Sequence, residues 1–591
     1  MLRPRSAQEF IHWLEMGGGA RLVATTTALL GLLVLSLFVA WKQFQGVTAE
    51  SALLQADVGR QLARGEGFST LVNLPQTAAF LQQRGHAFDA SQPYPELHHA
   101  PLYSVVIAGG LRLLPASFRE SLFDEAPVAP DGFGGDYFLL GLNLGLLWLT
   151  AWLTFALARR LFDAQVGWLA AFAVLLSVGI WQQTVIVNGA PLLMLLGVTA
   201  FWIWLRIDEQ AEATSRLAMA WLVALGASCG LLFLTEYSAG ALILVALGYA
   251  AFRFKAHGRW RALILLMAGF AVVTAPWTIR NINVAGNPVA LAVQNVALKF
   301  GDPTAEPSTY RRTLSAELPS IDLKKLANKT LTGVQQSLQE RLWSGGAMWF
   351  AGFLAAGWLY TFRSSSANRL RWVFTVALGV MILSQALFNS GESERFVTGW
   401  MAPLIIVFGA GFFSVLLGSN AVLSQWPRWC MAGLLVVQAL PLAHDALEPR
   451  RLHFHYPPYF PALFIGVHRE LQGRDTVGRF GVMADVPAGV AWYGQQRVWA
   501  QPQRLRDFYA ITLEQPIGGL LLTPHTLDRP FFSELAARPV EPAAFGHATD
   551  RFGEWGRIYA GLFTGRMPAD FPLNAPQKLA ENLYVLMNPA L

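Results

Sequence analysis

Long apolar runs dominate this sequence and limit what it can fold into. Runs of spanning length fall at about 22–41, 137–158, 164–182, 189–206, 217–235, 238–254, 261–279, 345–362, 370–388, 398–418 and 428–446. A stretch of about 20 apolar residues is what an α-helix needs to cross the hydrocarbon core of a bilayer. The sequence therefore predicts an α-helical polytopic membrane protein with about eleven spans.

Charged residues are scarce over the whole chain, which supports this interpretation. Only 14% of the 591 residues are charged and 54% are hydrophobic, whereas a soluble protein carries about 25% charged residues. The formal net charge of +6 would suit nucleic acid, but the arginines lie at helix ends, where they set topology instead. Cys229 and Cys430 both lie inside apolar runs, so neither a disulfide framework nor a thiolate metal site is expected.

Positive charges in the short loops predict an orientation. Arginines precede the first apolar run and recur in alternate loops, for example as Arg159 and Arg160 and then as Arg206 and Arg216. Because positively charged loops stay on the cytoplasmic side, we expect the N-terminus inside and the C-terminus outside. The Arg-rich and Ala-rich composition favours a bacterial cytoplasmic (inner) membrane.

This topology places three longer segments on the outer face. They are 42–136, 280–344 and 447–591, called the first, second and third outer segments below. The third is long enough to be a domain, and its short apolar runs alternate with helix-like stretches. We therefore expect a transmembrane bundle over 1–446 and an extracytoplasmic α/β domain over 447–591. The run 101–114 is too short to cross a membrane and is expected to be an interfacial helix.

Two acids of the first outer segment are the first candidates for chemistry. Glu50 follows the first apolar run within a few residues, and Asp57 comes seven positions later. In a helix this spacing is about two turns, so both carboxylates would lie on one face near the membrane surface. The alternative is that they are ordinary solvated acids of an interfacial helix, which is the commoner case for an isolated pair.

Five motifs on the expected outer face resemble one family. The first outer segment contains ESALLQADVGRQLARGEGF and HAPLYSVVIAGGLRLL. These resemble the first outer loop of the GT-C glycosyltransferases, which include the protein O-mannosyltransferases and the aminoarabinose transferases of lipid A. Later motifs resemble a helix connection, the end of a mid-chain helix and a helix entry of the same family; they are RRLFDAQVGWLAAFAVLLS, APWTIRNINVAGNPV and SERFVTGWMAPL. Their order over residues 22–418 makes the resemblance fairly specific.

The resemblance implies a hexosyl or pentosyl transferase. Members of the family move a sugar from a polyprenyl-phosphate-linked donor to a glycan, lipid or protein acceptor on the outer face, with an acid of the first loop as base. By position, Glu50 matches that acid best and Asp57 is second. A carboxylate suits this role because the acceptor hydroxyl loses its proton as its oxygen attacks the anomeric carbon. The expected partners are this donor, the acceptor and membrane lipids.

The resemblance also assigns residues to the donor phosphate. His99 stands where the family often has Lys or His, and Arg280 and Arg395 match its basic positions. Fixed cations would offset the charge that grows on the leaving phosphate. Glu236 stands where members commonly carry Arg, and is expected to take a polar role in substrate binding. The alternatives are interfacial anchors for the arginines, a helix cap for His99 and a helix end for Glu236.

One departure from the family pattern keeps other functions open. Many members carry a second acid where this chain has Asn188, which cannot act as a base. A catalytically silent relative that serves as a scaffold is one alternative. A transporter of a lipid-linked intermediate is another, although the helices show no inverted repeat. No His or acid spacing resembles a metal-ligand set, so no cofactor is predicted and a divalent metal is left open.

The candidate residues are expected to share one site. We predict an outward-facing cavity reached laterally from lipid, with walls that include Glu50, Asp57, His99, Arg280 and Arg395. Ionisable groups at the membrane edge are functional candidates by default. The third outer segment is expected to dock over this cavity, because its aromatic side chains are too many to leave in water.

Overall fold

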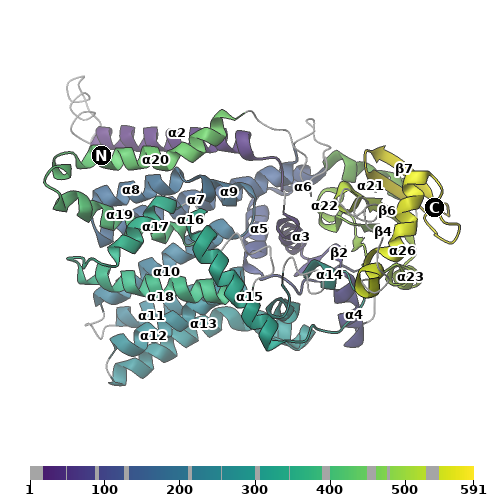
Figure 1. Cartoon of the computed structure of the whole chain (residues 1–591), viewed down its shortest axis with the longest axis horizontal. Coiled ribbons are helices and arrows are strands. Elements are labelled where there is room, and N and C mark those ends of the chain that lie inside the picture. Colours follow the sequence, from purple (N-terminus) through teal and green to yellow (C-terminus); the bar gives the residue numbers. More distant parts are fainter. Residues whose placement is uncertain are drawn as a thin grey trace.

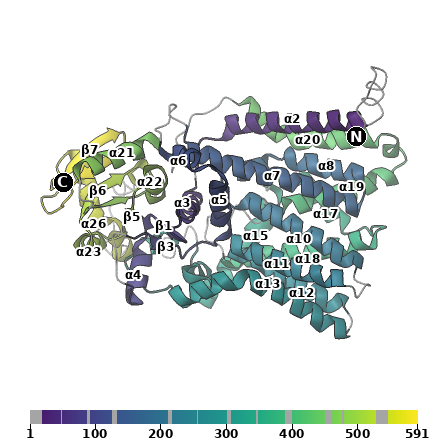
Figure 2. The same ribbon diagram turned by 180° about the vertical axis from the view of Figure 1, so that it is seen from behind.

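A computed structural model shows a helical bundle joined to a smaller α/β region (Figure 1). It describes residues 18–47, 49–86, 92–124, 132–210, 216–254, 256–299, 307–344, 347–388, 400–448, 461–475, 479–527 and 545–590. The bundle lies at one end and the sheet at the other. Helices α3 and α5 of the first outer segment lie between them in both views (Figures 1 and 2).

Helices occupy at least part of each of the eleven apolar runs. They are α2 (Gly18–Gln43), α7 (Gly134–Leu161), α8 (Ala164–Leu175), α9 (Val178–Val185), α10 (Ala190–Gln210), α11 (Arg216–Thr235), α12 (Leu242–Arg253), α13 (Ala256–Ala285), α17 (Met348–Gly357), α18 (Ser365–Phe388), α19 (Ala402–Ser419) and α20 (Pro427–Leu447). Among the described residues, seven helices are long and apolar enough to cross a membrane, or eight if the bent pair α8 and α9 forms one span. The chain is a multi-pass membrane protein, but the expected count of about eleven spans is not confirmed.

The shorter helices have local causes. α8 and α9 are bent by 52° relative to each other, and at this break the Ser177 hydroxyl accepts a hydrogen bond from the backbone N–H of Ile180 at 3.4 Å. A serine that caps a new helix in this way ends the previous one. The 3₁₀ helix η1 (Tyr237–Ala241) similarly separates α11 from α12, which leaves α12 only 12 residues.

Small residues set the closest helix contacts of the bundle. A Cβ on Gly226 of α11 would lie 2.0 Å from the carbonyl oxygen of Leu266 in α13. A Cβ on Gly269 of α13 would lie 2.2 Å from the carbonyl oxygen of Val223 in α11. Because lipid is as apolar as the helices themselves, close backbone packing of this kind is a main source of stability within a bilayer.

The first outer segment folds into a layer of short elements beside the bundle. They are α3 (Glu50–Arg64), β1 (Ser69–Thr70), β2 (Val72–Asn73), α4 (Pro75–Gln83), β3 (Tyr94–Pro95), α5 (Leu102–Leu113) and α6 (Ala116–Asp124). α5 is the short apolar helix expected over 101–114, and it packs directly on α3. A Cβ on Gly59 would lie 2.7 Å from Cγ2 of Ile107, so only glycine allows this approach.

The second outer segment is fastened to the bundle by a buried lysine. Its elements are η2 (Ala290–Val296), α14 (Pro307–Arg311), α15 (Leu323–Gln336), the π-helical turn η3 (Ser337–Arg341) and α16 (Leu342–Ser344). The ammonium of Lys329 donates hydrogen bonds to the carbonyls of Asn295, Val296 and Leu387 at 2.5, 3.2 and 3.0 Å. These carbonyls lie at the ends of η2 and α18, so Lys329 holds α15 against both.

A six-stranded sheet forms the core of the α/β region. Its order is β2-β5-β4-β6-β8-β7, with β4 (Gly481–Ala484), β5 (Val498–Ala500), β6 (Ile517–Leu522), β7 (Ala575–Ala580) and β8 (Leu583–Met587). The first four strands in this order are parallel, and β8 and β7 are antiparallel. The other elements of this region are α21 (Pro461–Arg474), α22 (Pro487–Gly494), α23 (Leu505–Glu514), α24 (Pro524–Leu527) and α26 (Phe545–Thr564). Every residue of β6 is buried, as is usual for a parallel strand covered on both faces.

The sheet draws one strand from the first outer segment. Val72 and Asn73 of β2 pair in parallel with Val498 and Trp499 of β5. The α/β fold therefore includes residues outside 447–591. We propose that the first and third outer segments form one docked unit on the bundle, with the boundary near 447 marking only where the chain leaves the last bundle helix.

Helix α22 connects this unit to the bundle. Asp136, at the start of α7, accepts hydrogen bonds from the indole N–H of Trp492 at 2.8 Å and from the hydroxyl of Tyr493 at 2.9 Å. All three residues are buried. A buried carboxylate with two donors is a specific contact, so the third outer segment rests on the bundle in a defined orientation.

Candidate functional site

A polar pocket lies where five parts of the chain meet: α3, the turn before α5, the α9–α10 junction, the α11–η1 break and the second outer segment. It encloses about 680 Å³ of space, part of it open to solvent. Its polar lining comprises Ser51, Gln55, His98, His99, Asn188, Thr235, Glu236, Tyr237, Asn295 and Arg311. This set, called the polar pocket below, contains cationic and acidic side chains beside an apolar bundle.

The break between α11 and η1 brings Glu236 to the pocket. α11 ends at Thr235, and Glu236 is extended, with φ −149° and ψ 120°. Its backbone is fixed on both sides, because its N–H donates to the carbonyl of Leu232 and its carbonyl accepts from Ala239, each at 2.9 Å. A carboxylate at an interrupted helix can face a cavity where a continuous helix would bury it.

Asn188 has a structural role at the same pocket. Its side-chain oxygen accepts a hydrogen bond from the backbone N–H of Ala190 at 3.0 Å, in the first turn of α10. Its carbonyl accepts from the amide of Asn143 at 3.1 Å. An asparagine that caps a helix start explains the residue type here without any catalytic function.

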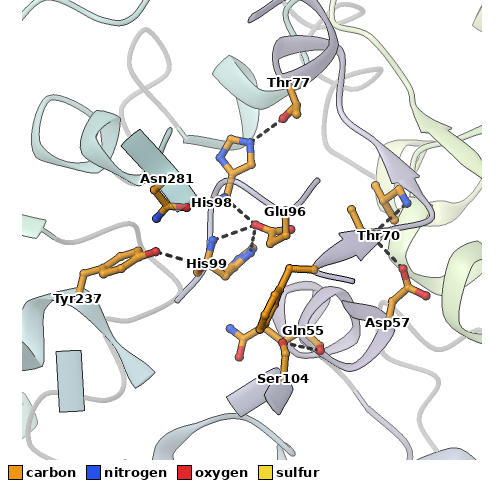
Figure 3. Close-up of polar contacts among 12 residues, drawn as sticks. Gln55, Asp57, Thr70, Thr77, Glu96, His98, His99, Ser104, Tyr237 and Asn281 are labelled. Carbon is orange, nitrogen blue, oxygen red and sulfur yellow. Dashed lines mark hydrogen bonds and ion pairs between the residues drawn. The ribbon is translucent and has the colours of Figure 1, made fainter. Parts of the chain in front are cut away.

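Glu96 is the centre of the polar contacts beside the pocket (Figure 3). One of its carboxylate oxygens accepts hydrogen bonds from the backbone N–H groups of His98 and His99 at 2.6 and 2.9 Å. The same oxygen lies 3.1 Å from Nδ1 of His99. Burial alone would raise the pKa of Glu96, but His99 and His98 outweigh it and hold the pKa well below its usual range.

His98 is held as a neutral ring. Its Nε2 lies 3.0 Å from the Thr77 hydroxyl, and its Nδ1 lies 3.5 Å from the amide nitrogen of Gln294. A neutral imidazole has one donor and one acceptor, which fits these partners. Burial lowers the pKa of His98 to about 3, with the charge of Arg311 acting in the same direction.

Arg280 lies behind the pocket and supports it. Its guanidinium donates to the carbonyl of Glu96 at 2.8 Å and to the side-chain oxygen of Asn281 at 2.9 Å. It also stacks on Trp277, with its central carbon 4.7 Å from the ring centroid. Arg280 is not among the pocket-lining residues, so it acts on the pocket through the backbone of Glu96.

The two acids of the first outer segment do not line the polar pocket. Asp57 is fully buried and pairs with Arg60 at 2.7 Å. It also accepts from the Thr70 hydroxyl at 2.9 Å and from the backbone N–H of Leu71 at 2.8 Å. Glu50 is partly buried in the first turn of α3. The catalytic role of either acid stays a prediction.

The rotation of successive residues around α3 explains why Glu50 and Asp57 do not line the polar pocket. Each helical residue rotates by about 100°, so Glu50 and Asp57 share one face, as expected from their spacing. Gln55, which lines the pocket, is rotated by about 140° from Glu50 on the same helix. Ser51 is the α3 residue next to Glu50 that reaches the pocket.

The structure thus brings part of the predicted set together. His99 and Glu236 line one pocket, Arg280 lies behind it, and Arg395 lies outside the described residues. Sequence reasoning missed three residues, Glu96, His98 and Arg311. Glu96 had a local signal, an acid three positions before a histidine. Arg311 had none, because it reaches the pocket only through the fold of the second outer segment.

The pocket can act on a ligand through charged side chains held in fixed positions. Among the described residues, no group of three or more His, Cys, Asp or Glu side chains is arranged to hold a metal ion. The pocket offers the guanidinium of Arg311, the imidazole of His99 and the carboxylate of Glu236. Such a set can bind a phosphate and accept a proton.

One family model matches part of the chain that contributes to the pocket. Residues 90–300 match the family model described as dolichyl-phosphate-mannose-protein mannosyltransferase. The matched range contains Glu96, His99 and Glu236, and it ends before Arg311. No curated protein matches the chain.

Solved structures identify the fold. The apo oligosaccharyltransferase of Archaeoglobus fulgidus matches with a TM-score of 0.50 at 12% identity, over 85% of this chain and 70% of that one. The chain has the GT-C fold. ArnT of Cupriavidus metallidurans bound to undecaprenyl phosphate is also similar, with a TM-score of 0.49 at 13% identity, over 86% of this chain and 95% of that one. The GT-C resemblance expected from the sequence is confirmed for the fold.

Proposed function

We propose that this GT-C protein is a membrane glycosyltransferase that uses a polyprenyl-phosphate sugar. The observation that carries the proposal is the polar pocket, which joins cations to a carboxylate at the edge of the bundle. A lipid-linked donor needs such a place, because its tail stays in hydrocarbon while its phosphate must meet polar groups. The family match over 90–300 supports the same activity.

The proposed reaction has one bond formed and one broken. The acceptor oxygen attacks the anomeric carbon, and the bond from that carbon to the phosphate oxygen breaks. The polyprenyl phosphate leaves with the bonding electrons, and the acceptor's proton passes to a carboxylate. Cations stabilise the leaving phosphate because its negative charge increases in the transition state. We assign this task to His99 and Arg311, which line the pocket.

Three carboxylates are candidates for the base. Glu50 is the first-loop acid favoured by the family pattern, and it sits beside the pocket-lining residue Ser51 in α3. Glu236 lines the pocket itself. A base must come within hydrogen-bond reach of the proton that it removes, so the geometry favours Glu236. Asp57 is third, because its partners already satisfy it.

The charge pattern supports a location for the reaction. Arginines in alternate short loops favour a cytoplasmic N-terminus, which puts the pocket and the docked sheet on the outer face. In a bacterium this face is the periplasmic side of the inner membrane. The acceptor would then be a glycan, a lipid or a protein present there.

Sugar transfer can be tested with the purified protein in detergent. A panel of polyprenyl-phosphate sugars is incubated with the protein and a membrane extract as acceptor, and release of polyprenyl phosphate is measured by mass spectrometry. Loss of a general base costs about 10²–10⁴-fold in rate, so Glu236→Gln should fall by that amount. The matched control is Glu66→Gln, an exposed acid of the same outer segment, which should leave the rate unchanged.

The other outcomes separate the alternatives. If Glu50→Gln is inactive and Glu236→Gln is active, the base is the first-loop acid and the activity stands. If the wild-type protein consumes no donor from the panel under any condition, the glycosyltransferase proposal fails. Uptake of a lipid-linked intermediate into proteoliposomes by the same preparation would then favour a transporter.

A further inference from the structure

A second pocket lies in the α/β region and shares no lining residue with the polar pocket. It encloses about 370 Å³ of space, part of it open to solvent. Helices α4 and α23 and strand β5 contribute to its walls, and the two helices lie at the same end of the molecule in both views (Figures 1 and 2). Its lining includes Gln82, Tyr94, Leu314, Trp499 and Glu514, and it is called the aromatic pocket below. A concave site with apolar and aromatic walls and a few polar groups is the usual form of a small-molecule site.

Two aromatic rings form a rigid wall of the aromatic pocket. The rings of Tyr94 and Trp499 meet edge to face, with their centroids 6.3 Å apart and their planes at 69°. The indole N–H of Trp499 donates a hydrogen bond to the side-chain oxygen of Gln515 at 2.8 Å, and Tyr94 pairs with Thr70 in the antiparallel ladder of β3 and β1. Both rings are therefore held in place before a ligand binds, which lowers the entropy cost of binding.

A polar pair completes the aromatic pocket. The side-chain amide of Gln82 in α4 donates a hydrogen bond to the carboxylate of Glu514 in α23 at 3.1 Å, and both residues are exposed. A carboxylate accepts on both oxygens, and an amide both donates and accepts, so the pair can also bind hydroxyl groups of a ligand. Burial and the charge of Glu514 raise the pKa of Tyr94, so the Tyr94 hydroxyl stays protonated.

This combination of side chains fits an uncharged sugar ring. One face of a pyranose presents C–H groups that pack on an aromatic ring, while its hydroxyls project from the edge and need hydrogen-bond partners. Among the described lining residues there is no Lys, Arg or His, so a phosphate or carboxylate group would meet Glu514 without a counter-charge. An apolar peptide side chain would leave the pair of Gln82 and Glu514 unused.

The aromatic pocket is a neighbour of the polar pocket. Leu314 lines the aromatic pocket and Arg311 lines the polar pocket, and three residues of chain separate their Cα atoms by at most about 11 Å. Tyr94 and His98 are divided between the two pockets in the same way, and four residues separate their Cα atoms by at most about 14 Å. Two separate segments thus limit the distance between the pockets to one that a short oligosaccharide can bridge.

We propose that the aromatic pocket binds an uncharged sugar unit of the acceptor while the attacking hydroxyl of the acceptor lies in the polar pocket. The acceptor is then a glycan, with the recognised unit a short distance from the hydroxyl that is modified. This inference rests on the proposed function, because it takes the polar pocket as the place of transfer. The aromatic pocket touches no reacting atom, so it binds ground state and transition state equally and lowers the KM for the acceptor without changing kcat.

The test measures glycan binding by the full chain in detergent, without donor. The probe is a panel of defined neutral oligosaccharides of glucose, galactose, mannose or N-acetylglucosamine, immobilised through the reducing end. The variants are Glu514→Ala, Gln82→Ala, Tyr94→Ala and Tyr94→Phe. Gln83→Ala and Glu581→Ala are matched controls, because both residues are exposed and neither lines the aromatic pocket. Thermal unfolding of each variant is recorded without ligand.

At least one oligosaccharide of the panel should bind the wild-type protein. Its dissociation constant should rise about tenfold or more in Glu514→Ala, which removes a hydrogen bond to a charged group. Tyr94→Ala should weaken binding as much, whereas Tyr94→Phe, which keeps the ring, should bind nearly as tightly as the wild-type protein. Gln82→Ala should also bind more weakly, and the two controls should match the wild-type protein. Because Gln82 and Glu514 are exposed, their variants keep the test valid if Tyr94→Ala does not fold.

The kinetic readout separates acceptor from donor. The oligosaccharide that binds should inhibit sugar transfer competitively with the acceptor and not with the donor. Glu514→Ala should raise the KM for the acceptor about tenfold at unchanged kcat, with the KM for the donor unchanged. A purely structural role of Glu514 would lower kcat or thermal stability as well.

Several results would overturn the inference. If no oligosaccharide binds, or if Glu514→Ala and Tyr94→Ala bind as the wild-type protein does, the aromatic pocket is not a sugar site, and the proposed function survives wherever transfer is still measured. A rise in KM for a protein acceptor that carries no glycan would show that the pocket binds peptide instead. A protein that binds an oligosaccharide through this pocket but releases no polyprenyl phosphate from any donor would overturn the proposed function, and with it the acceptor role of the pocket.

Discussion

The guanidinium of Arg60 donates a hydrogen bond of 2.8 Å to the carbonyl of Trp492. A second bond of 2.7 Å reaches the carbonyl of Ala491, and the guanidinium carbon lies 5.0 Å from the Trp492 ring centroid. Arg60 belongs to α3 and Trp492 to α22, so this contact joins the first outer segment to the third. The guanidinium of Arg60 forms a salt bridge of 2.7 Å with the carboxylate of Asp57. Among the described residues, this is the salt bridge that compensates the charge of Arg60.

Asp57→Asn should destabilise the protein more than it affects the chemistry. Removing one partner of a buried ion pair leaves the other charge uncompensated, which costs about 3–5 kcal/mol. We expect a clear drop in the midpoint of thermal unfolding in detergent, with the surviving folded fraction still able to transfer sugar. The matched control is Arg566→Ala, at an exposed position, which should unfold like the wild-type protein.

An inactive Asp57→Asn protein with unchanged thermal stability would contradict this account. It would return Asp57 to its predicted role as a candidate for the catalytic base. The two measurements have to be made on the same preparation, because unfolding during the assay would imitate a loss of catalysis.

Stability should fall on mild acidification because of His98. Burial lowers its pKa from 6.5 in the unfolded chain to about 3 in the folded state. Between these values the unfolded chain binds a proton that the folded protein does not, so stability is fully present above about pH 6.5 and is lost as the pH falls. The unfolding midpoint should therefore drop between about pH 7 and about pH 5.5, above the range in which ordinary carboxylates titrate.

Replacement of His98 tests the cause of that pH dependence. His98→Gln should flatten the curve over this range, whereas His86→Gln, an exposed histidine of the same segment, should leave it unchanged. A curve that stays equally steep in His98→Gln would assign the acid sensitivity to another group.

Lys329→Met should loosen the second outer segment. The ammonium donates to three backbone carbonyls at the ends of η2 and α18, and each carbonyl left without a donor costs about 1–3 kcal/mol. Because Asn295 also lines the polar pocket, donor binding should weaken as well. The control is Lys325→Met on the exposed face of the same helix. Equal stability of the two variants would contradict the fastening role.

Gly269→Ala should disturb the packing of α11 on α13. The added Cβ would lie 2.2 Å from the Val223 carbonyl oxygen, so the helices must separate, and overpacking of this kind costs about 1–3 kcal/mol or more. Gly248→Ala in α12 is the control, since its Cβ would meet no atom within 4 Å. A thermal midpoint for Gly269→Ala at or above that of Gly248→Ala would show that this contact can relax.

Local patterns in the sequence were sufficient to predict the bundle. Apolar runs of about 20 residues specify helices, and each predicted run contains one. The span count was harder to predict because helix breaks depend on single capping residues. Ser177 interrupts the predicted run 164–182, and the 3₁₀ helix η1 takes the first residues of the predicted run 238–254.

Long-range contacts account for most of what the sequence did not show. Strand β2 has only two residues, too few to be predicted from alternation, and it exists because β5 lies beside it. The prediction for Arg280 identified a residue near the site. Its guanidinium, however, donates hydrogen bonds to the carbonyl of Glu96 and the side-chain oxygen of Asn281 and does not line the pocket. Arg311 lies about 200 residues from His99 in sequence, and nothing local predicts their meeting.

The most direct test of the central claim is an experimental structure of the protein with a bound polyprenyl phosphate. We predict phosphate density in the polar pocket, within hydrogen-bond distance of the His99 imidazole and of the Arg311 guanidinium, with Glu236 beside the position of the sugar and the lipid tail passing between bundle helices. Phosphate density on another surface, with the polar pocket filled by side chains or water alone, would contradict the account.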